Sequence, residues 1–208
     1  TSLRYTRRSL ELIERYGFGV AVQTKSARIL EDLDLLRRIN ERAKCVVEMT
    51  LTTYDDDLCR LLEPHVSVTS ERFAVLEAMR DAGIPTVVWF SPLLPYLNDT
   101  EENLRGVLDY CVRAQVRGII CFGIGLTLRD GSREYFYTQL DRHFPGLSAR
   151  YRRKYGNRYE IVSDRHEELM PLFHEICRSH GIMSGIEENF SYLRTFASST
   201  CGEQLTLF

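Results

Sequence analysis

AGIPTVVWFSPLLPYLND, residues 82–99, holds one structural unit together with both of its boundaries. Gly83 ends a helical pattern, as glycine does in the left-handed position after a helix. The run TVVWFS at Thr86–Ser91 has the β-branched and aromatic composition of a buried strand. Asp99, with Glu102 three residues later, has the spacing of a capping box and predicts the start of the next helix. Helix, strand, loop and helix therefore follow one another.

The same order of elements recurs on both sides of this stretch. Short β-rich runs alternate with segments whose apolar residues recur at helical spacing. We expect strands at 19–25, 45–52, 86–91 and 118–124, and helices at 5–15, 30–39, 70–82 and 99–113. This alternation predicts an α/β fold of about four βα units, with a parallel sheet and right-handed crossovers.

Composition excludes several classes of protein. The 208 residues are 44% hydrophobic and 27% charged, which excludes a disordered, collagen-like or coiled-coil chain. No apolar run is long enough for a membrane span, and the start lacks the apolar core of a secretory signal, so we expect a cytoplasmic protein with no membrane partner. The formal net charge of −2 leaves any nucleic-acid contact to a local basic surface. Because the chain opens with Thr1 inside a polar helical pattern, we expect a piece of a longer protein.

The cysteines and histidines do not predict a metal site. The six cysteines lie far apart, with no CxxC or CxxxCxxC run, which fits neither a local zinc site nor a contiguous iron-sulfur loop. We expect reduced and mostly buried thiols. The five histidines show no pairing at metal-ligand intervals, and we expect them on the surface or in packing roles.

Two of the predicted strands carry polar side chains on one face. Side chains alternate along a strand, so Gln23 and Lys25 share a face in one strand, and Glu48, Thr50 and Thr52 share a face in the next. Because parallel strands end at the same edge of a sheet, we expect a polar-lined interior at the edge where such sheets bind ligands. The opposite residues of the second strand are apolar and are expected to pack on helices.

Lys25 has three interpretations that the residues leave open. The structural one is a buried ion pair with Glu48. The second is a donor that holds a ligand carboxylate or phosphate at the strand end. The third is the Schiff-base nucleophile of a self-contained lyase or aldolase, which requires a depressed pKa.

The loop after the third strand has a composition that restricts its backbone. Ser91–Asp99 contains two prolines, which fix the backbone and remove two donors, so we expect a rigid loop at the ligand end of the sheet. The alternative is an ordinary strand-to-helix turn with Asp99 as the N-cap. In the fourth strand Gly123 and Gly125 allow close approach of a ligand or of a neighbouring backbone.

Several segments, in order along the chain, point to a known family. They are TRRSLELIERYGFGVAVQTKS, the strand that ends at Thr50–Thr53, LLEPHVS with Glu63 and Pro64, Arg72, AGIPT and SPLLPYLND. Together they resemble the spore photoproduct lyase-like group of radical S-adenosylmethionine proteins, often labelled DNA repair photolyases. The resemblance covers the chain up to roughly residue 130, and more loosely the FPGL and YGNRY segments.

The resemblance implies a partial (β/α) barrel of six βα units, of which this chain holds the last four. In such proteins a CxxxCxxC loop binds three irons of a [4Fe-4S] cluster and S-adenosylmethionine chelates the fourth, but that loop is absent here. By position, Lys25 matches the lysine that reaches the methionyl carboxylate, Thr50 stands where a serine often contacts the cofactor, and Ser91 lines the same cavity. The resemblance thus implies the C-terminal portion of a radical enzyme that acts on DNA, inactive without the cluster segment.

We accordingly divide the chain into three parts. Residues 1–130 form the partial barrel, residues 131–198 a helical C-terminal extension, and residues 199–208 a flexible tail. Within the extension, helices are expected at 132–144, 148–155 and 164–180.

Basic residues and tyrosines alternate between Arg142 and Tyr159. This pattern suits phosphate contacts combined with base stacking. The alternative is a helix with a tyrosine packing stripe and a solvated basic face. The candidate DNA-binding residues are Arg150, Tyr151, Arg152, Arg153, Lys154 and Tyr155.

The last five residues, QLTLF, resemble the short peptide with which many bacterial DNA-repair and replication proteins dock on the sliding clamp. An exposed terminus would offer an amide for hydrogen bonds and an aromatic anchor for an apolar pocket. The alternative is a tail folded onto the core. The candidate clamp-binding residues are Gln204, Leu205, Leu207 and Phe208. A second hypothesis is therefore a non-catalytic module that binds DNA or the clamp.

Overall fold

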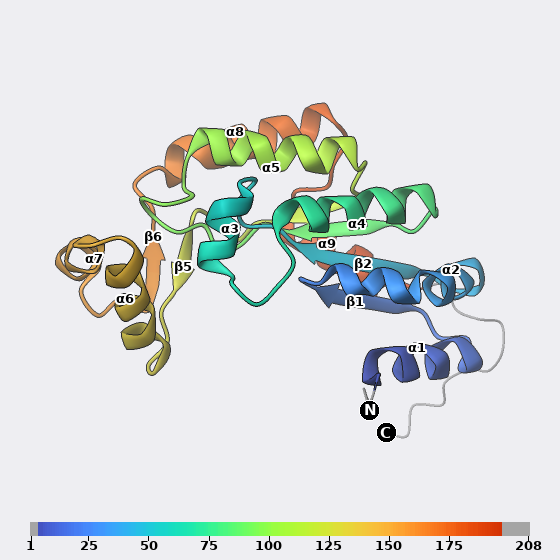
Figure 1. Cartoon of the computed structure of the whole chain (residues 1–208). Helices are drawn as coiled ribbons and strands as arrows, with labels where there is room; N and C mark the ends of the chain where they lie inside the picture. Colours follow the sequence, from blue (N-terminus) through green and yellow to red (C-terminus); the bar gives the residue numbers. More distant parts are fainter. Residues whose placement is uncertain (1–3, 197–208) are drawn as a thin grey trace, which may run out of the picture.

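A parallel four-stranded sheet forms the centre of the fold. The computed structural model describes residues 4–196. Strands β1 (Val20–Thr24), β2 (Cys45–Thr50), β3 (Thr86–Trp89) and β4 (Gly118–Ile120) lie in the order β1-β2-β3-β4, each parallel to its neighbours. Figure 1 shows the helices that connect them packed around this sheet. The predicted α/β class and the parallel sheet of four strands are confirmed.

The helices follow the predicted order, with additions. The first ends at Gly17, whose φ of 70° is the left-handed conformation that glycine adopts without strain. The helices are α1 (Tyr5–Tyr16), the 3-10 helix η1 (Ala27–Asp32), α2 (Leu33–Arg42), α3 (Asp56–Leu62), α4 (Thr69–Asp81), α5 (Glu101–Arg113), α6 (Ser132–His143), α7 (Leu147–Tyr155), α8 (His166–Ser179) and α9 (Ile186–Arg194). None of these helices is long and apolar enough to cross a membrane.

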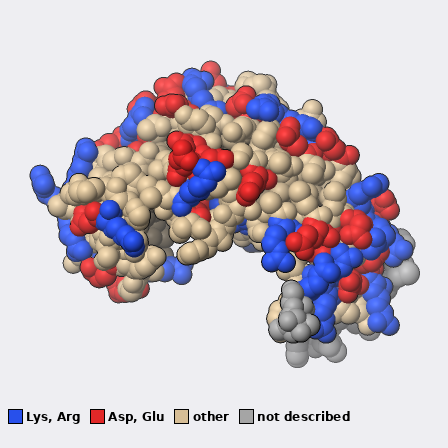
Figure 2. Space-filling model, viewed as in Figure 1, with Lys and Arg blue, Asp and Glu red and all other residues tan. Residues whose placement is uncertain are grey.

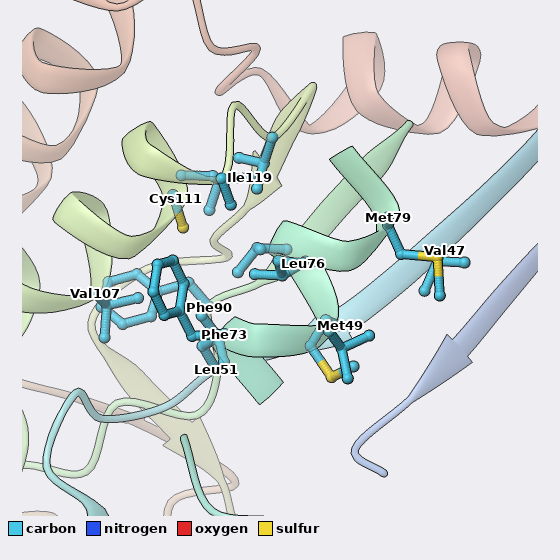
Figure 3. Close-up of a cluster of buried hydrophobic side chains, with 14 of the residues drawn as sticks. Val47, Met49, Leu51, Phe73, Leu76, Met79, Phe90, Val107, Cys111 and Ile119 are labelled. Atoms are coloured by element: carbon cyan, nitrogen blue, oxygen red, sulfur yellow. The ribbon is translucent and has the colours of Figure 1, made fainter. Parts of the chain in front are cut away.

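One face of the sheet, here called the outer face, packs against α2, α4, α5 and α8. The side chains of Val47, Met49 and Leu51 point to this face and are fully buried, as the alternation along β2 predicts. Figure 3 shows Leu76 and Met79 of α4 in the same apolar cluster. Burying a side chain of this size contributes about 1.5–3 kcal/mol, so the outer face supplies most of the apolar stabilisation of the sheet.

The opposite, inner face is only partly covered. Val46, Val87 and Ile120 pack against Leu193 of α9. The α9 helix is held there by Asn189, whose side-chain amide donates to the carbonyl oxygens of Ile119, Met183 and Gly185 at 2.8–3.3 Å. The α9 helix thus reaches the carboxyl ends of β3 and β4, whereas Lys25 and Thr52, which follow β1 and β2, line an open hollow.

A small lobe stands at the carboxyl side of the sheet. Strands β5 (Gly125–Thr127) and β6 (Glu160–Val162) pair antiparallel, and α6 and α7 pack on them around an apolar core separate from that of the main sheet. Figure 1 shows this lobe set apart from the rest, whereas α8 returns to lie beside α5. Within residues 131–196, α6, α7 and β6 belong to the lobe, and α8 and α9 cover the main sheet.

Candidate functional site

The register of the sheet brings the predicted polar side chains together on the inner face. Glu48 of β2 lies between Gln23 of β1 and Val87 of β3, and Thr50 lies beside Trp89. Lys25 follows β1, one residue past the pairing of Thr24 with Met49, so it continues the row that contains Thr50. Lys25 and Thr52 line the hollow at the carboxyl ends of the strands, whereas Thr50 is buried and Ser91 lines a neighbouring pocket with Phe122 and Gly123.

The ion pair of Lys25 differs from the one that the strand pattern suggested. The Lys25 ammonium contacts the Glu63 carboxylate, which comes from the segment after α3, and not Glu48. The Glu48 carboxylate instead accepts a hydrogen bond from the indole N–H of Trp89. The prediction of a Lys25–Glu48 pair is wrong, because the chain returns over the strand ends after α3 and places a second acid closer to Lys25.

Glu63 also pairs with a fully buried arginine. The Arg72 Nη1 atom, on α4, lies 2.8 Å from the Glu63 Oε2 atom, and Arg72 donates to the backbone oxygens of Thr50 at 2.9 Å and Ser67 at 2.7 Å. Burial alone would raise the pKa of the Glu63 carboxyl, but the hydrogen bond from Lys25 and the charge of Arg72 outweigh it and lower that pKa. Two cations and one anion leave the group of Lys25, Glu63 and Arg72 with a net positive charge.

This charge is open to the hollow through Lys25 alone. The Lys25 side chain is 39% exposed, the Glu63 side chain 13% and the Arg72 side chain not at all. An anionic ligand group would therefore approach the cluster at Lys25. An ion-paired ammonium lacks the free electron pair that imine formation needs, so this geometry argues against the Schiff-base interpretation.

The loop from Ser91 to Asp99 is fixed by two asparagines. The buried side chain of Asn98 donates to the carbonyl oxygen of Thr52 at 2.8 Å and accepts from the backbone N–H of Leu94. Asn103 of α5 donates to the same Thr52 oxygen at 3.0 Å. The loop is thus bonded to the end of β2, as expected of a rigid loop, and Ser91 is half-buried at its start.

Asp99 does not cap α5. The N-cap is Thr100, whose hydroxyl accepts the backbone N–H of Asn103 at 3.1 Å. Asp99 is buried instead, where it accepts hydrogen bonds from the backbone N–H of Tyr96 at 2.7 Å and from the Ser163 hydroxyl. Burial raises the pKa of its carboxyl, and the Ser163 hydrogen bond offsets only part of that rise. The capping prediction is wrong because the carboxylate joins the loop to the β6–α8 connection.

The predicted DNA-binding residues of α7 fall into two groups, exposed basic residues and buried tyrosines. Arg150, Arg152, Arg153 and Lys154 are exposed, so the basic face is present. Tyr151 and Tyr155 are buried in the core of the lobe. The prediction that these two tyrosines stack on bases is wrong, because the helix turns them inward as a packing stripe. The clamp-binding residues Gln204, Leu205, Leu207 and Phe208 lie outside the described residues.

Residues 4–196 contain no group of three or more histidine, cysteine, aspartate or glutamate side chains that could hold a metal ion. The five cysteines in this part of the chain are free and buried, as predicted. Burial raises the pKa of Cys45 to about 12 and that of Cys121 to about 11, which keeps both as neutral thiols. These side chains do not fit an iron-sulfur cluster.

Glu63 and Arg72 lie at the centre of the site, although the sequence patterns assign them no role. Both occur only as parts of the segments that carry the family resemblance. Lys25 and Glu63 are 38 positions apart, so no local spacing relates them. The sequence feature that could have identified the Lys25–Glu63 pair is the position of Glu63 directly after the short helix that follows β2. That connection must cross the carboxyl ends of the strands.

No protein-family model matches the chain. Among curated proteins, an uncharacterized protein of Mycobacterium tuberculosis (strain ATCC 25618 / H37Rv) is 32% identical over 162 residues, which cover 78% of this chain and 45% of that protein. An uncharacterized protein of Acidianus two-tailed virus is 24% identical over 178 residues, 84% of this chain and 53% of that protein. The chain thus spans about half the length of the curated relatives that it matches.

Solved structures share the fold. A domain of the pyruvate-formate lyase-activating enzyme from Bacteroides vulgatus ATCC 8482 has a TM-score of 0.56 at 14% identity, covering 87% of this chain and 88% of that one. A spore photoproduct lyase mutant with bound AdoMet and dinucleoside spore photoproduct has a TM-score of 0.56 at 16% identity, covering 86% and 54%. A radical SAM methyltransferase from Sphaerobacter thermophilus has a TM-score of 0.50 at 16% identity, covering 88% and 46%. The chain therefore has the partial-barrel fold of radical S-adenosylmethionine enzymes.

Proposed function

We propose that this chain supplies the part of a radical S-adenosylmethionine enzyme, of the spore photoproduct lyase-like group, that holds the methionyl end of S-adenosylmethionine. The observation that carries the proposal is the position of Lys25. Its half-exposed side chain follows the carboxyl end of β1, in the inner-face row that continues to the buried Thr50 of β2, and it lines the open hollow there. Ligands of open parallel sheets bind at this end of the strands.

The donor set fits the chemistry of this cofactor. S-adenosylmethionine carries a carboxylate, and Lys25 presents the net positive charge of the Lys25, Glu63 and Arg72 group to the hollow. Thr50 and Ser91 add hydroxyl groups on the neighbouring strands, and a hydroxyl donates to and accepts from ribose or amino groups equally well.

The described residues have separate tasks in this proposal. Lys25 binds the carboxylate, and Glu63 holds the ammonium at the strand end when no ligand is present. Arg72 keeps Glu63 in place from inside the protein. When bound, the cofactor supplies the 5′-deoxyadenosyl group on which this class of enzyme relies. The cluster ligands that such chemistry needs are not among residues 4–196, so no step through a cluster is assigned to these side chains.

Binding of S-adenosylmethionine tests the proposal. The protein is expressed from the complete reading frame that encodes this chain, and its affinity for S-adenosylmethionine is measured by isothermal titration calorimetry. Lys25→Met should weaken binding about tenfold to a hundredfold, since a hydrogen bond to a charged group is worth about 1.5–3 kcal/mol.

Lys154→Met is the matched control, because Lys154 lies on α7 and pairs with Asp164. It should leave the affinity within about twofold of the original protein, a difference of less than 0.5 kcal/mol. Equal affinity for S-adenosylmethionine in the Lys25→Met variant and the original protein would overturn the proposal.

A further inference from the structure

The hollow at Lys25 continues as a groove of about 710 Å³ between the lobe and the rest of the molecule. One wall is the end of α3 with the segment through His65, and the other wall is α6 of the lobe. The loop from Ser91 to Asp99 and strand β5 form the floor. Figure 2 shows the arched outline of the molecule, with the lobe at the same end as in Figure 1. A movement of the lobe would therefore change the width of the groove.

The lobe is attached to the main sheet through a small interface. Within the part of the chain that the structure describes, no helix or strand of the lobe makes an extended contact with a helix or strand outside it. The lobe core packs instead against Tyr96 and Leu97 of the loop after β3, and the Tyr151 hydroxyl donates to the Pro95 carbonyl oxygen at 2.8 Å. Two parts of a chain that share only a small interface are expected to move relative to each other.

The two crossings between the main sheet and the lobe have the arrangement of a hinge. The chain enters the lobe after β4 and leaves it after β6, and the backbone N–H of Ser163 in the second crossing donates to the Ile124 carbonyl oxygen in the first at 2.9 Å. Gly123, in the first crossing, has a φ of 126°, a conformation that glycine adopts without strain. Adjacent crossings define one axis, and a few residues at the ends of elements can absorb the backbone rotation.

The loop after β3 connects this hinge to the candidate site. Ser91, its first residue, is one of the proposed cofactor contacts, and Asp99 at its end accepts a hydrogen bond from the Ser163 hydroxyl beside the hinge. Between them, the Leu93 N–H donates to the Gly125 carbonyl oxygen of β5 at 3.1 Å. Because the loop is bonded to the main sheet and to the lobe, a displacement at Ser91 is passed on to the lobe.

We infer that the lobe is a hinged lid that closes over the groove when S-adenosylmethionine binds, a role that rests on the proposed function for the identity of the ligand. A ligand shifts such an equilibrium only if it binds the closed form more tightly. S-adenosylmethionine meets this condition, because Lys25 belongs to the main sheet and Ser91 begins the loop that carries the lobe. Closure would exclude water from the groove and so protect a reactive intermediate from side reactions.

Double electron–electron resonance tests the inference on the protein expressed from its complete reading frame. A ketone-bearing amino acid, which takes a nitroxide label and leaves the cysteines untouched, replaces exposed Ala149 of α7 and exposed Glu41 of α2. A control pair has the labels at Glu41 and at exposed Glu175 of α8, both outside the lobe.

Without ligand, the lobe pair should have a broader distance distribution than the control pair. S-adenosylmethionine should shorten the mean distance of the lobe pair by at least about 2 Å, the size that separates a domain rearrangement from a local adjustment. The mean distance of the control pair should stay unchanged.

Tyr151→Phe tests the link between the loop and the lobe, because it removes only the hydroxyl that donates to Pro95. It should broaden the ligand-free distribution of the lobe pair and reduce the shift that S-adenosylmethionine causes. Tyr137→Phe is the matched control, since Tyr137 lies in the same lobe core and its buried hydroxyl has no hydrogen-bond partner among residues 4–196. It should leave both values unchanged. Ser163→Ala, which removes the bond to Asp99, should act like Tyr151→Phe.

A lobe pair that does not move when S-adenosylmethionine binds, or equal shifts in the two label pairs, would overturn the inference and leave the proposed function standing. Equal effects of Tyr137→Phe and Tyr151→Phe would overturn the role of the loop as the link. If S-adenosylmethionine does not bind, the proposed function fails together with ligand-driven closure, and equal ligand-free widths in the two pairs then overturn the hinge as well.

Discussion

Glu63 is the residue on which the charge balance of the site depends. It lies between Lys25 and the fully buried Arg72, and its lowered pKa reflects both partners. Glu63→Gln would leave Arg72 without a counter-charge, and breaking such a pair costs about 3 kcal/mol, the lower end of the range for buried ion pairs. Urea unfolding at neutral pH measures this loss of stability.

The pH dependence of that loss has a defined sign. A carboxyl whose pKa is lower in the folded state stabilises the protein above its ordinary pKa of about 4.3 and loses that contribution as the pH falls through the folded value. The difference between the original protein and Glu63→Gln should therefore be constant from neutral pH down to about 5 and shrink below it. Glu101→Gln, an exposed control on α5, should change stability by less than about 0.5 kcal/mol. An equal loss of stability in both variants would contradict the role of Glu63 as the counter-charge of Arg72.

The pH dependence of stability that we expect from Asp99 has the opposite sign. Its pKa is raised by burial, so its ionisation costs folding stability as the pH rises through the folded value. Asn at this position can still accept from the Tyr96 N–H through Oδ1, and its Nδ2 can donate to the Ser163 hydroxyl oxygen in place of the bond that Asp99 Oδ2 accepts. We predict that Asp99→Asn is at least as stable as the original protein at neutral pH and that this advantage disappears near pH 4, the ordinary range of aspartate. A marked loss of thermal stability at neutral pH would show that the charge itself is needed.

Among the elements, α9 depends on a single glycine of β4. A Cβ at Gly118 would lie 2.0 Å from the Asn189 Oδ1 atom, and Asn189 is the side chain that fixes α9 to the sheet. We predict that Gly118→Ala destabilises the protein by about 1–3 kcal/mol, the usual cost of overpacking. Chemical denaturation measures this change.

Gly185→Ala, at the N-cap of α9, is the matched control. A Cβ there would meet Glu188 at 3.5 Å, which is ordinary contact, and the backbone is extended with φ of −76°. This substitution should cost no more than about 0.5 kcal/mol. If Gly118→Ala is as well tolerated as Gly185→Ala, α9 is not held in the way described.

Elements with a clear apolar or β-rich pattern could be predicted from sequence, and elements without one could not. The segment 70–82 has clear apolar periodicity and became α4 within one residue at each end. The β5 and β6 strands have three residues each, too few for an alternating pattern to emerge. Gly125 begins β5 because the Ile161 backbone lies too close for a residue with a Cβ atom. The α9 helix was missed because its buried anchor is a polar residue, Asn189.

The candidate site could be predicted only in part, because some of its residues are placed by local alternation and others by the tertiary fold. Alternation along β1 and β2 places Lys25 and Thr50 on one face whatever the rest of the chain does, so local sequence suffices for them. The position of Glu63, the partner of Lys25, depends on the path of the connection after α3, which is a property of the tertiary fold. The burial of Tyr151 and Tyr155 likewise depends on the lobe core, because a helical stripe of tyrosines can face inward or outward.

The whole molecule is an arch that leaves two surfaces open. Figure 1 places the α6–α7 lobe at one end and α1 at the other. Among the described strands, β1 lies at one edge of the sheet, and the inner face is open where Lys25 and Thr52 follow β1 and β2. An edge strand of a parallel sheet is normally paired or covered. This arrangement is consistent with a chain that spans about half the length of its curated relatives.

The most direct test of the account is an experimental structure of the protein, expressed from its complete reading frame and crystallised anaerobically with S-adenosylmethionine. We predict that the methionyl carboxylate lies within hydrogen-bonding distance of Lys25 Nζ and that the Thr50 and Ser91 hydroxyls contact the same cofactor. A structure in which the cofactor occupies another place while Lys25 remains bonded only to Glu63 would contradict it.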